Sequence, residues 1–202
     1  MSDLQDAARK GDVNQLLRLI AGKADVNYQC KPGESGYSTW NSIPVTALYI
    51  AAEKGHGAAV QVLINAKAWI NHQNNCPPSL HIAAQKGHTG IVQVLIDNKA
   101  SLDNRVCDPL LSAVNGGHSA ILHALIAAKA NVNADSRCDQ PLHLAVSKKN
   151  MDMVKMLVAA RADPSLHLPL PYDGKSTETA LQKAEKSGQP ALADFLRCWE
   201  IV

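Results

Sequence analysis

Cysteine and histidine carry the most reactive side chains of this chain, and both recur at regular intervals. Cys76, Cys107 and Cys138 follow one another at a spacing of 31 residues, and Cys30 precedes them. Thiolate and imidazole groups are common ligands of zinc, so the first chemistry to weigh is a metal or redox array. No Cys-x-x-Cys pair is present, however. The cysteines therefore form no compact zinc-binding or redox motif along the chain.

The histidines are placed just as regularly. His56, His88 and His118 each follow a glycine, and His81 and His143 each follow a leucine near an expected helix start. A catalytic site would need a nucleophile, a base and an oxyanion group close together, and no stretch of the sequence combines them. No glycine-rich loop that could hold a phosphate occurs either. We therefore expect no enzyme, no cofactor and no metal.

The glycine–histidine pairs mark a repeat. Gly55, Gly87 and Gly117 lie 32 and 30 residues apart, and weaker matches continue up and down the chain. Short apolar runs of helical period lie on either side of each pair, as in residues 79–86 and 91–96. A near-constant period in the low thirties is typical of stacked repeat proteins. Because one helix pair cannot bury its apolar face alone, neighbouring repeats must stack.

Each repeat opens and closes on a similar motif. The openings include residues 78–83, Pro-Ser-Leu-His-Ile-Ala, and residues 140–145, Gln-Pro-Leu-His-Leu-Ala. The closings include residues 24–27, Ala-Asp-Val-Asn, and residues 130–133, Ala-Asn-Val-Asn. These segments resemble the Thr-Pro-Leu-His-x-Ala opening and the Ala-Asp-Val-Asn close of ankyrin repeats, and the resemblance covers nearly the whole chain. It implies an all-α solenoid: a right-handed stack of about six helix pairs, terminal caps included, with extended β-hairpin-like fingers.

The resemblance also implies a domain organisation. We expect one ankyrin repeat domain over 1–202, made of an N-terminal capping repeat (1–27), an expanded finger loop (28–45), four full repeats (46–165), a second expanded finger (166–177) and a C-terminal capping repeat (178–202). The polar flanks of the first and last helix pairs suit capping repeats, so we expect the array to be complete.

Local signals agree with this organisation. Thr46 and Asp108 can supply N-cap oxygens, Pro109 and Pro141 fall at first helical positions, and Gly55 suits a left-handed turn at a helix end.

Stacking argues against chemistry at the cysteines. Equivalent positions in stacked repeats lie about 8–10 Å apart, whereas a disulfide needs Cα atoms within about 7 Å and zinc holds sulfur at about 2.3 Å. We interpret the cysteines as small finger residues. In ankyrin repeats the histidines are structural and bond to backbone groups, which we expect here for His56, His88 and His118.

Composition limits the partners. The formal net charge is +2, so no strong attraction to nucleic acid or to an anionic membrane is expected. No signal peptide and no run of about 18 apolar residues is found. We expect an intracellular, cytoplasmic protein, monomeric and without membrane insertion.

Aromatic residues depart from the repeat pattern near the first finger. Tyr37 and Trp40 lie inside the expanded loop, Tyr49 stands where the family has His, and Trp69 stands where it has Asp. Tryptophan and tyrosine are frequent anchors of protein interfaces, so these four are candidate partner-binding residues. The alternative is a small local core in which the long loop covers them.

Lysines and asparagines recur as well. Lys54, Lys86 and Lys148, with Lys10 before them, precede the glycine position of their repeats and could face an acidic partner segment. A cation in the last helical turn is also favoured by the helix dipole alone. The resemblance implies a further role for Asn27, Asn71 and Asn133, which match the asparagine that an asparaginyl hydroxylase modifies in many ankyrin proteins.

These observations favour protein–protein recognition through the concave face and the finger loops, without catalysis. Two alternatives stay open. One is a regulatory inhibitor or a secreted bacterial effector that docks on a host protein in the host cytosol. The other is a metal-linked or enzymatic role that uses the cysteines and histidines.

Overall fold

The structure, a computed structural model, describes residues 3–29, 45–71, 78–104, 107–134, 140–166 and 178–199. These residues form twelve α-helices and no strand, which confirms the all-α repeat fold. The helices divide between two compact units, residues 1–101 (unit 1) and residues 102–202 (unit 2). Tyr37, Trp40 and most of both expanded fingers lie outside the described residues.

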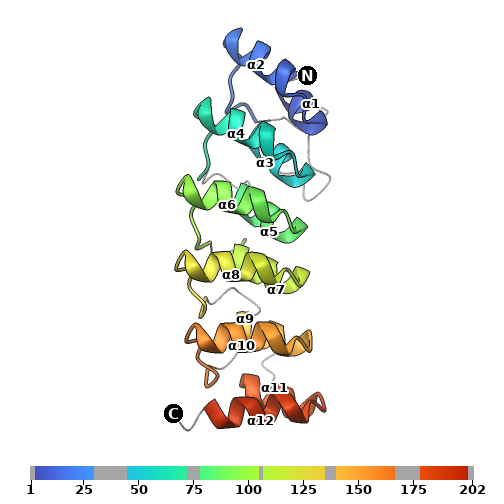
Figure 1. The fold of residues 1–202 in the computed structure, drawn as a ribbon, viewed down its shortest axis with the longest axis vertical. Coiled ribbons are helices and arrows are strands. Elements are labelled where there is room, and N and C mark those ends of the chain that lie inside the picture. The colour runs from blue at the N-terminus through green and yellow to red at the C-terminus, as the bar shows by residue number, and fades with distance from the viewer. Residues whose placement is uncertain are drawn as a thin grey trace. The chain divides into compact units, whose positions relative to one another are not determined.

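Unit 1 contains three helix pairs (Figure 1). Their helices are α1 (Asp3–Lys10), α2 (Val13–Ala21), α3 (Ala47–Lys54), α4 (Gly57–Asn65), α5 (Ser79–Lys86) and α6 (Thr89–Asp97). The first helices of the pairs, which we call inner helices, pack in the order α1, α3, α5. The second helices, which we call outer helices, pack in the order α2, α4, α6.

Small and branched apolar side chains make this packing dense. Ala51 and Ala52 of α3 and Ala83 and Ala84 of α5 are fully buried. Alanine lets adjacent helices approach closely, and the outer helices fill the remaining space with residues such as Leu63. The inner helices are therefore almost wholly core.

Helix starts follow the sequence signals. The Thr46 hydroxyl accepts a hydrogen bond from the Tyr49 amide at 3.2 Å, and so caps α3. In unit 2 the Asp108 carboxylate accepts from the Leu110 and Leu111 amides at 2.7 and 3.2 Å. Pro109 follows Asp108 at the first position of α7, where its missing amide hydrogen costs nothing. The predicted caps are confirmed.

Unit 2 also contains three helix pairs. Its helices are α7 (Pro109–Gly116), α8 (Ser119–Ala127), α9 (Pro141–Ser147), α10 (Met151–Ala159), α11 (Ala180–Lys186) and α12 (Pro190–Trp199). The inner helices α7, α9 and α11 pack in sequence, and α10 packs against α8.

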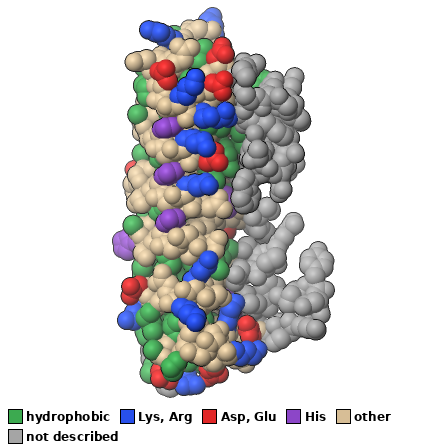
Figure 2. Space-filling model, turned by 90° about the vertical axis from the view of Figure 1, so that its right-hand side faces the viewer, with side chains coloured by type: hydrophobic (Ala, Val, Ile, Leu, Met, Phe, Trp, Pro, Cys, Tyr) green, Lys and Arg blue, Asp and Glu red, His purple; other side chains and the backbone are tan. Residues whose placement is uncertain are grey.

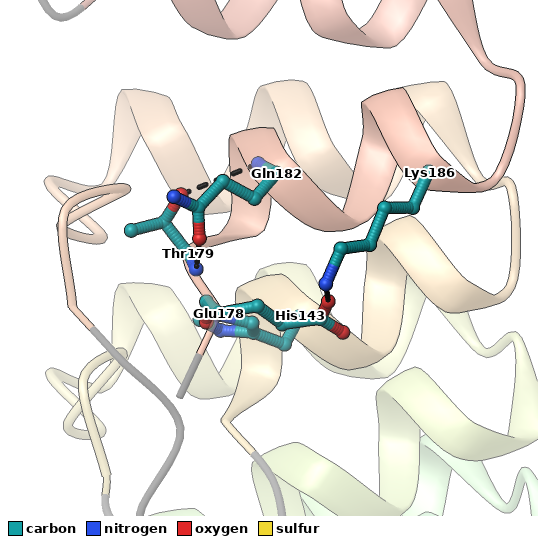
Figure 3. A network of polar contacts seen from close by, with 5 residues as sticks. All are labelled: His143, Glu178, Thr179, Gln182 and Lys186. Carbon is teal, nitrogen blue, oxygen red and sulfur yellow. Dashed lines mark hydrogen bonds and ion pairs between the residues drawn. The ribbon is translucent and has the colours of Figure 1, made fainter. Parts of the chain in front are cut away.

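A polar network joins the last two inner helices of unit 2 (Figure 3). The buried His143 ring contacts the Glu178 carbonyl through Nε2 at 2.9 Å. Since a carbonyl oxygen only accepts, Nε2 must carry the hydrogen. Thr179 and Gln182 exchange hydrogen bonds at the start of α11, in the reciprocal arrangement known as a capping box. The segment that precedes α11 is thus hydrogen-bonded to His143 of α9.

Candidate protein-binding surface

Trp69 is the more exposed of the two predicted aromatic residues that the structure describes, Tyr49 and Trp69. It follows α4, its side chain is 53% exposed, and its amide donates to the Asn27 side-chain oxygen at 2.7 Å. The backbone that carries the indole is therefore attached to the preceding repeat. A large apolar side chain on such a support is suited to contact another protein.

Tyr49 lies in a different environment. Only 6% of it is exposed, on the mostly buried helix α3. A ring at this depth offers little surface to a partner, so Tyr49 is a weaker candidate contact than Trp69. Tyr37 and Trp40 fall outside the described residues.

The predicted lysines lie at the ends of inner helices. Lys10, Lys54 and Lys86 end α1, α3 and α5 of unit 1, and all three are exposed. On this face Lys and Arg side chains gather beside a row of histidines (Figure 2). Lys54 also lies 3.6 Å from the Glu53 carboxylate, which partly offsets its charge. Lys148, at the end of α9, belongs to unit 2 and is exposed as well.

The structure separates Trp69 from Lys54. A two-residue turn follows Lys54, and the nine-residue helix α4 then runs back toward the opposite end of the pair. A helix of that length spans about 13 Å. Figure 1 shows the segments that follow α2, α4 and α6 on one side, away from the turns that join inner to outer helices. Trp69 and Lys54 therefore do not belong to one contiguous site.

Two of the histidines next to the glycines, His56 and His88, have the structural role expected of them. His56 Nε2 lies 2.9 Å from the Arg9 carbonyl, and His88 Nε2 lies 3.1 Å from the Glu53 carbonyl. Each ring thus bonds the end of the preceding inner helix. An imidazole used in this way is not available to hold a metal through the same nitrogen.

The described residues include two cysteines, Cys107 and Cys198. Within the described ranges no three His, Cys, Asp or Glu side chains are grouped closely enough to hold a metal ion. Cys107 is half-buried, and burial raises the pKa of its thiol, so little of the reactive thiolate is present at neutral pH. Cys198 is exposed. Cys30, Cys76 and Cys138 lie outside the described residues.

A second set of lysines was missed by the sequence interpretation. Each outer helix from α2 to α10 ends in a C-cap residue, and the residue that follows the C-cap has a positive φ. In all five cases this residue is a lysine or an arginine. We call these five residues the cation turns: Lys23 (φ 62°), Lys67 (φ 67°), Lys99 (φ 64°), Lys129 (φ 71°) and Arg161 (φ 67°). The left-handed conformation costs a non-glycine residue roughly 1–2 kcal/mol. In the sequence, a lysine or an arginine directly precedes the alanine that begins each closing motif, and this pattern could have identified the cation turns.

Asparagine side chains support these turns from the preceding repeat. Asn71 donates to the Lys99 carbonyl at 2.8 Å and accepts from the Ser101 amide at 2.7 Å. Asn27 and Asn133 make the same pair of bonds, to Lys67 and Trp69 and to Arg161 and Asp163 respectively. We call these pairs the asparagine bridges. They give the three candidate hydroxylation residues a structural role.

No helix among the described residues is long and apolar enough to cross a membrane. The family model described as ankyrin repeats in three copies matches residues 4–106, 80–167 and 110–201. Curated relatives include cortactin-binding protein 2 of Dasypus novemcinctus, 41% identical over 69 residues, and that of Oryctolagus cuniculus, 39% identical over 69 residues. Each match covers 34% of this chain and 4% of the relative. The stacked helix pairs and the family match together show that this chain belongs to the ankyrin repeat family.

Proposed function

We propose that this chain is a non-catalytic module that binds another protein through a surface of unit 1 centred on Trp69. The exposed indole on a bridged backbone is the observation that carries the proposal. An interface gains most from a large side chain that is already held in place, because less conformational entropy is lost on binding.

The family supports the general role. Ankyrin repeats are generally protein-interaction modules, and the chain spans about 4% of the curated relatives it matches. The name of those relatives states that they bind cortactin, but the shared segment is only a few repeats long. We therefore propose no named partner. We propose that the chain acts as a monomer in the cytoplasm, and that Lys54, Lys86 and Lys148 are secondary sites that attract an acidic partner at long range.

Affinity capture with paired baits tests the role of Trp69. The baits are the wild-type chain, Trp69→Ala and Trp199→Ala; Trp199 is another exposed tryptophan, 41% exposed at the end of α12. We expect a partner that wild type and Trp199→Ala retain and that Trp69→Ala loses by tenfold or more, about the effect of a hot-spot residue.

Circular dichroism must first show equal helix content in all three baits. Partners retained equally by all of them would contradict the Trp69 site. Partners lost equally by both tryptophan variants would indicate non-specific apolar adhesion instead.

The asparagine bridges support a second, minor proposal. Asn27, Asn71 and Asn133 remain candidate acceptors for an asparaginyl hydroxylase, and Asn71 is exposed. Peptide mass spectrometry after incubation with such an enzyme should show the gain of one oxygen atom, and unmodified peptides would contradict it.

A further inference from the structure

Three cation turns of unit 1 form a line beside Trp69. Lys23, Lys67 and Lys99 follow the mutually packed helices α2, α4 and α6, and Lys67 is two residues from Trp69. We call these three lysines the cation row. All three side chains are exposed, and none is in a salt bridge with another described residue. The row therefore presents its charges to solvent.

Folding alone does not explain lysine at these positions. Glycine adopts a positive φ freely, and this chain uses glycine at positive φ after α1, α3 and α5. The helix dipole favours a cation near a helix end, and α4 and α6 have no basic residue in their last turn, but the gain of about 0.3–1 kcal/mol is smaller than the roughly 1–2 kcal/mol that the left-handed conformation costs. Placing lysine in the left-handed position is thus a conformational cost that an external contact would justify.

The asparagine bridges fix where the lysines stand. Asn27 donates to the Lys67 carbonyl, and Asn71 to the Lys99 carbonyl, at 3.4 and 2.8 Å. Because each bridge comes from the preceding repeat, successive turns are tied to one another. The row is held as a spaced set of charges and not as three independent loops.

The spacing selects the kind of partner. Packed helices lie about 8–10 Å apart. An extended segment in the polyproline II conformation has three residues per turn and advances about 3.1 Å per residue, so every third side chain lies on the same face and meets one lysine. The carboxylates of Asp25 and Asp97 lie two residues from Lys23 and Lys99 and are exposed. They would repel a continuous anionic surface, such as a membrane or a nucleic acid, more than a chain with spaced charges.

We propose that the cation row binds an extended acidic protein segment whose carboxylates recur at every third residue, next to the Trp69 contact. This inference rests on the proposed protein-binding role, and it assigns the acidic partner to Lys23, Lys67 and Lys99 as direct contacts.

A labelled synthetic peptide tests the proposal on the full chain. The probe has glutamate at every third position and serine and glycine elsewhere; a second probe has the same composition with its glutamates contiguous. Fluorescence anisotropy at physiological salt measures both. The variant Lys23→Gly/Lys67→Gly/Lys99→Gly removes the row and leaves a residue that suits a positive φ, so its melting temperature should match or exceed that of wild type. The matched control Lys149→Gln/Lys155→Gln/Lys183→Gln removes the same net charge from lysines of unit 2 that have no proposed role in binding.

We expect wild type to bind the spaced probe more tightly than the contiguous one. Loss of the row should weaken binding by about tenfold. The control should weaken it by less than about twofold, since salt screens a change of net charge that is not at the contact. Three results would overturn the proposal. Both variants could lose peptide affinity equally, wild type could show no preference for the spaced probe, or it could bind phosphatidylserine vesicles and not the peptide. If peptide binding requires the cation row but no Trp69-dependent partner is captured, only the proposed Trp69 site is contradicted. If a Trp69-dependent partner is captured but peptide binding does not require the row, only this inference is contradicted.

Discussion

In unit 1 one turn follows each inner helix and another follows each outer helix. The two turns have the same backbone motif, but the residue with the left-handed conformation differs between them. After α3, the amide of His56 bonds the Ala51 carbonyl at 3.0 Å, with Gly55 at φ 80° between them. After α4, the amide of Ala68 bonds the Leu63 carbonyl at 2.9 Å, with Lys67 at φ 67°. Both are Schellman-type helix ends, for which glycine is the ordinary choice.

In unit 1 glycine occupies the first turns, and the surroundings of Gly11 and Gly55 explain why; in unit 2 the first turn after α9 has Lys149 (φ 56°) instead. A Cβ atom on Gly55 would lie 2.8 Å from Cε1 of His88, and one on Gly11 would lie 2.7 Å from Nδ1 of His56. The histidine of the next repeat thus occupies the space that a side chain would need. The second turn opens to solvent, so a side chain fits there and its identity is free to serve a contact outside the fold. Packing therefore requires glycine in the turn after α3, whereas the residue in the turn after α4 can contribute to binding.

Alanine at two glycine turns should give the largest effect. Gly55→Ala combines the left-handed penalty with displacement of the His88 ring from its bond to the Glu53 carbonyl, so we expect a loss of about 2–4 kcal/mol. Gly117→Ala meets no atom within 4 Å and should cost only about 1 kcal/mol. Urea unfolding of both variants measures the difference. Equal losses would mean that the histidine contact contributes nothing.

The positions of the helix ends could be predicted from the sequence. The glycine–histidine spacing predicts the helix ends, and the Thr46 and Asp108 caps occur where the sequence places them. A local chain pattern can predict such features because a helix end depends on the residues within one turn of it.

The candidate site was harder to predict. Placing Trp69 and Lys54 at opposite ends of a pair requires knowing the direction of each helix in three dimensions. The burial of Tyr49 depends on how neighbouring helices pack around α3. The cation turns were overlooked because a lysine before an alanine does not reveal a positive φ. That conformation follows from the hydrogen bonds of the whole turn, and the asparagine that supports it comes from another repeat.

Removing an asparagine bridge tests the second turn directly. Asn71→Ala deletes two bonds, at 2.8 and 2.7 Å, and should cost about 1–2 kcal/mol. Asn133→Ala deletes a weaker pair, at 3.4 and 2.9 Å, and should cost less. Urea midpoints, with hydrogen exchange at the Ser101 amide for the first variant, check both. A loss at Asn133 that equals or exceeds the loss at Asn71 would contradict the ranking by bond length.

Asp103 offers the smallest and most specific test, because it stands where three other closings have a bridging asparagine. Its carboxylate accepts from the Asn131 amide at 3.3 Å, but when ionised it cannot donate to the Lys129 carbonyl. Asp103→Asn supplies that donor and should stabilise the chain by about 0.5–1 kcal/mol in urea unfolding at neutral pH. Lys129→Gly in the same background should leave this gain intact, since the bridge bonds the backbone.

The gain from Asp103→Asn should also depend on pH. Burial raises the pKa of Asp108 above its ordinary 3.8, two backbone hydrogen bonds lower it, and the charge of Asp103 adds a further increase. A carboxyl whose pKa is raised by folding favours the folded state below its unfolded pKa, and that stability is lost as the pH rises through the folded value. Removing the charge at position 103 lowers the pKa of Asp108 and reduces this loss, so the variant's advantage should be full at neutral pH and shrink below about pH 4. An advantage that persists unchanged into acid would mean that charge repulsion between positions 103 and 108 contributes nothing to it.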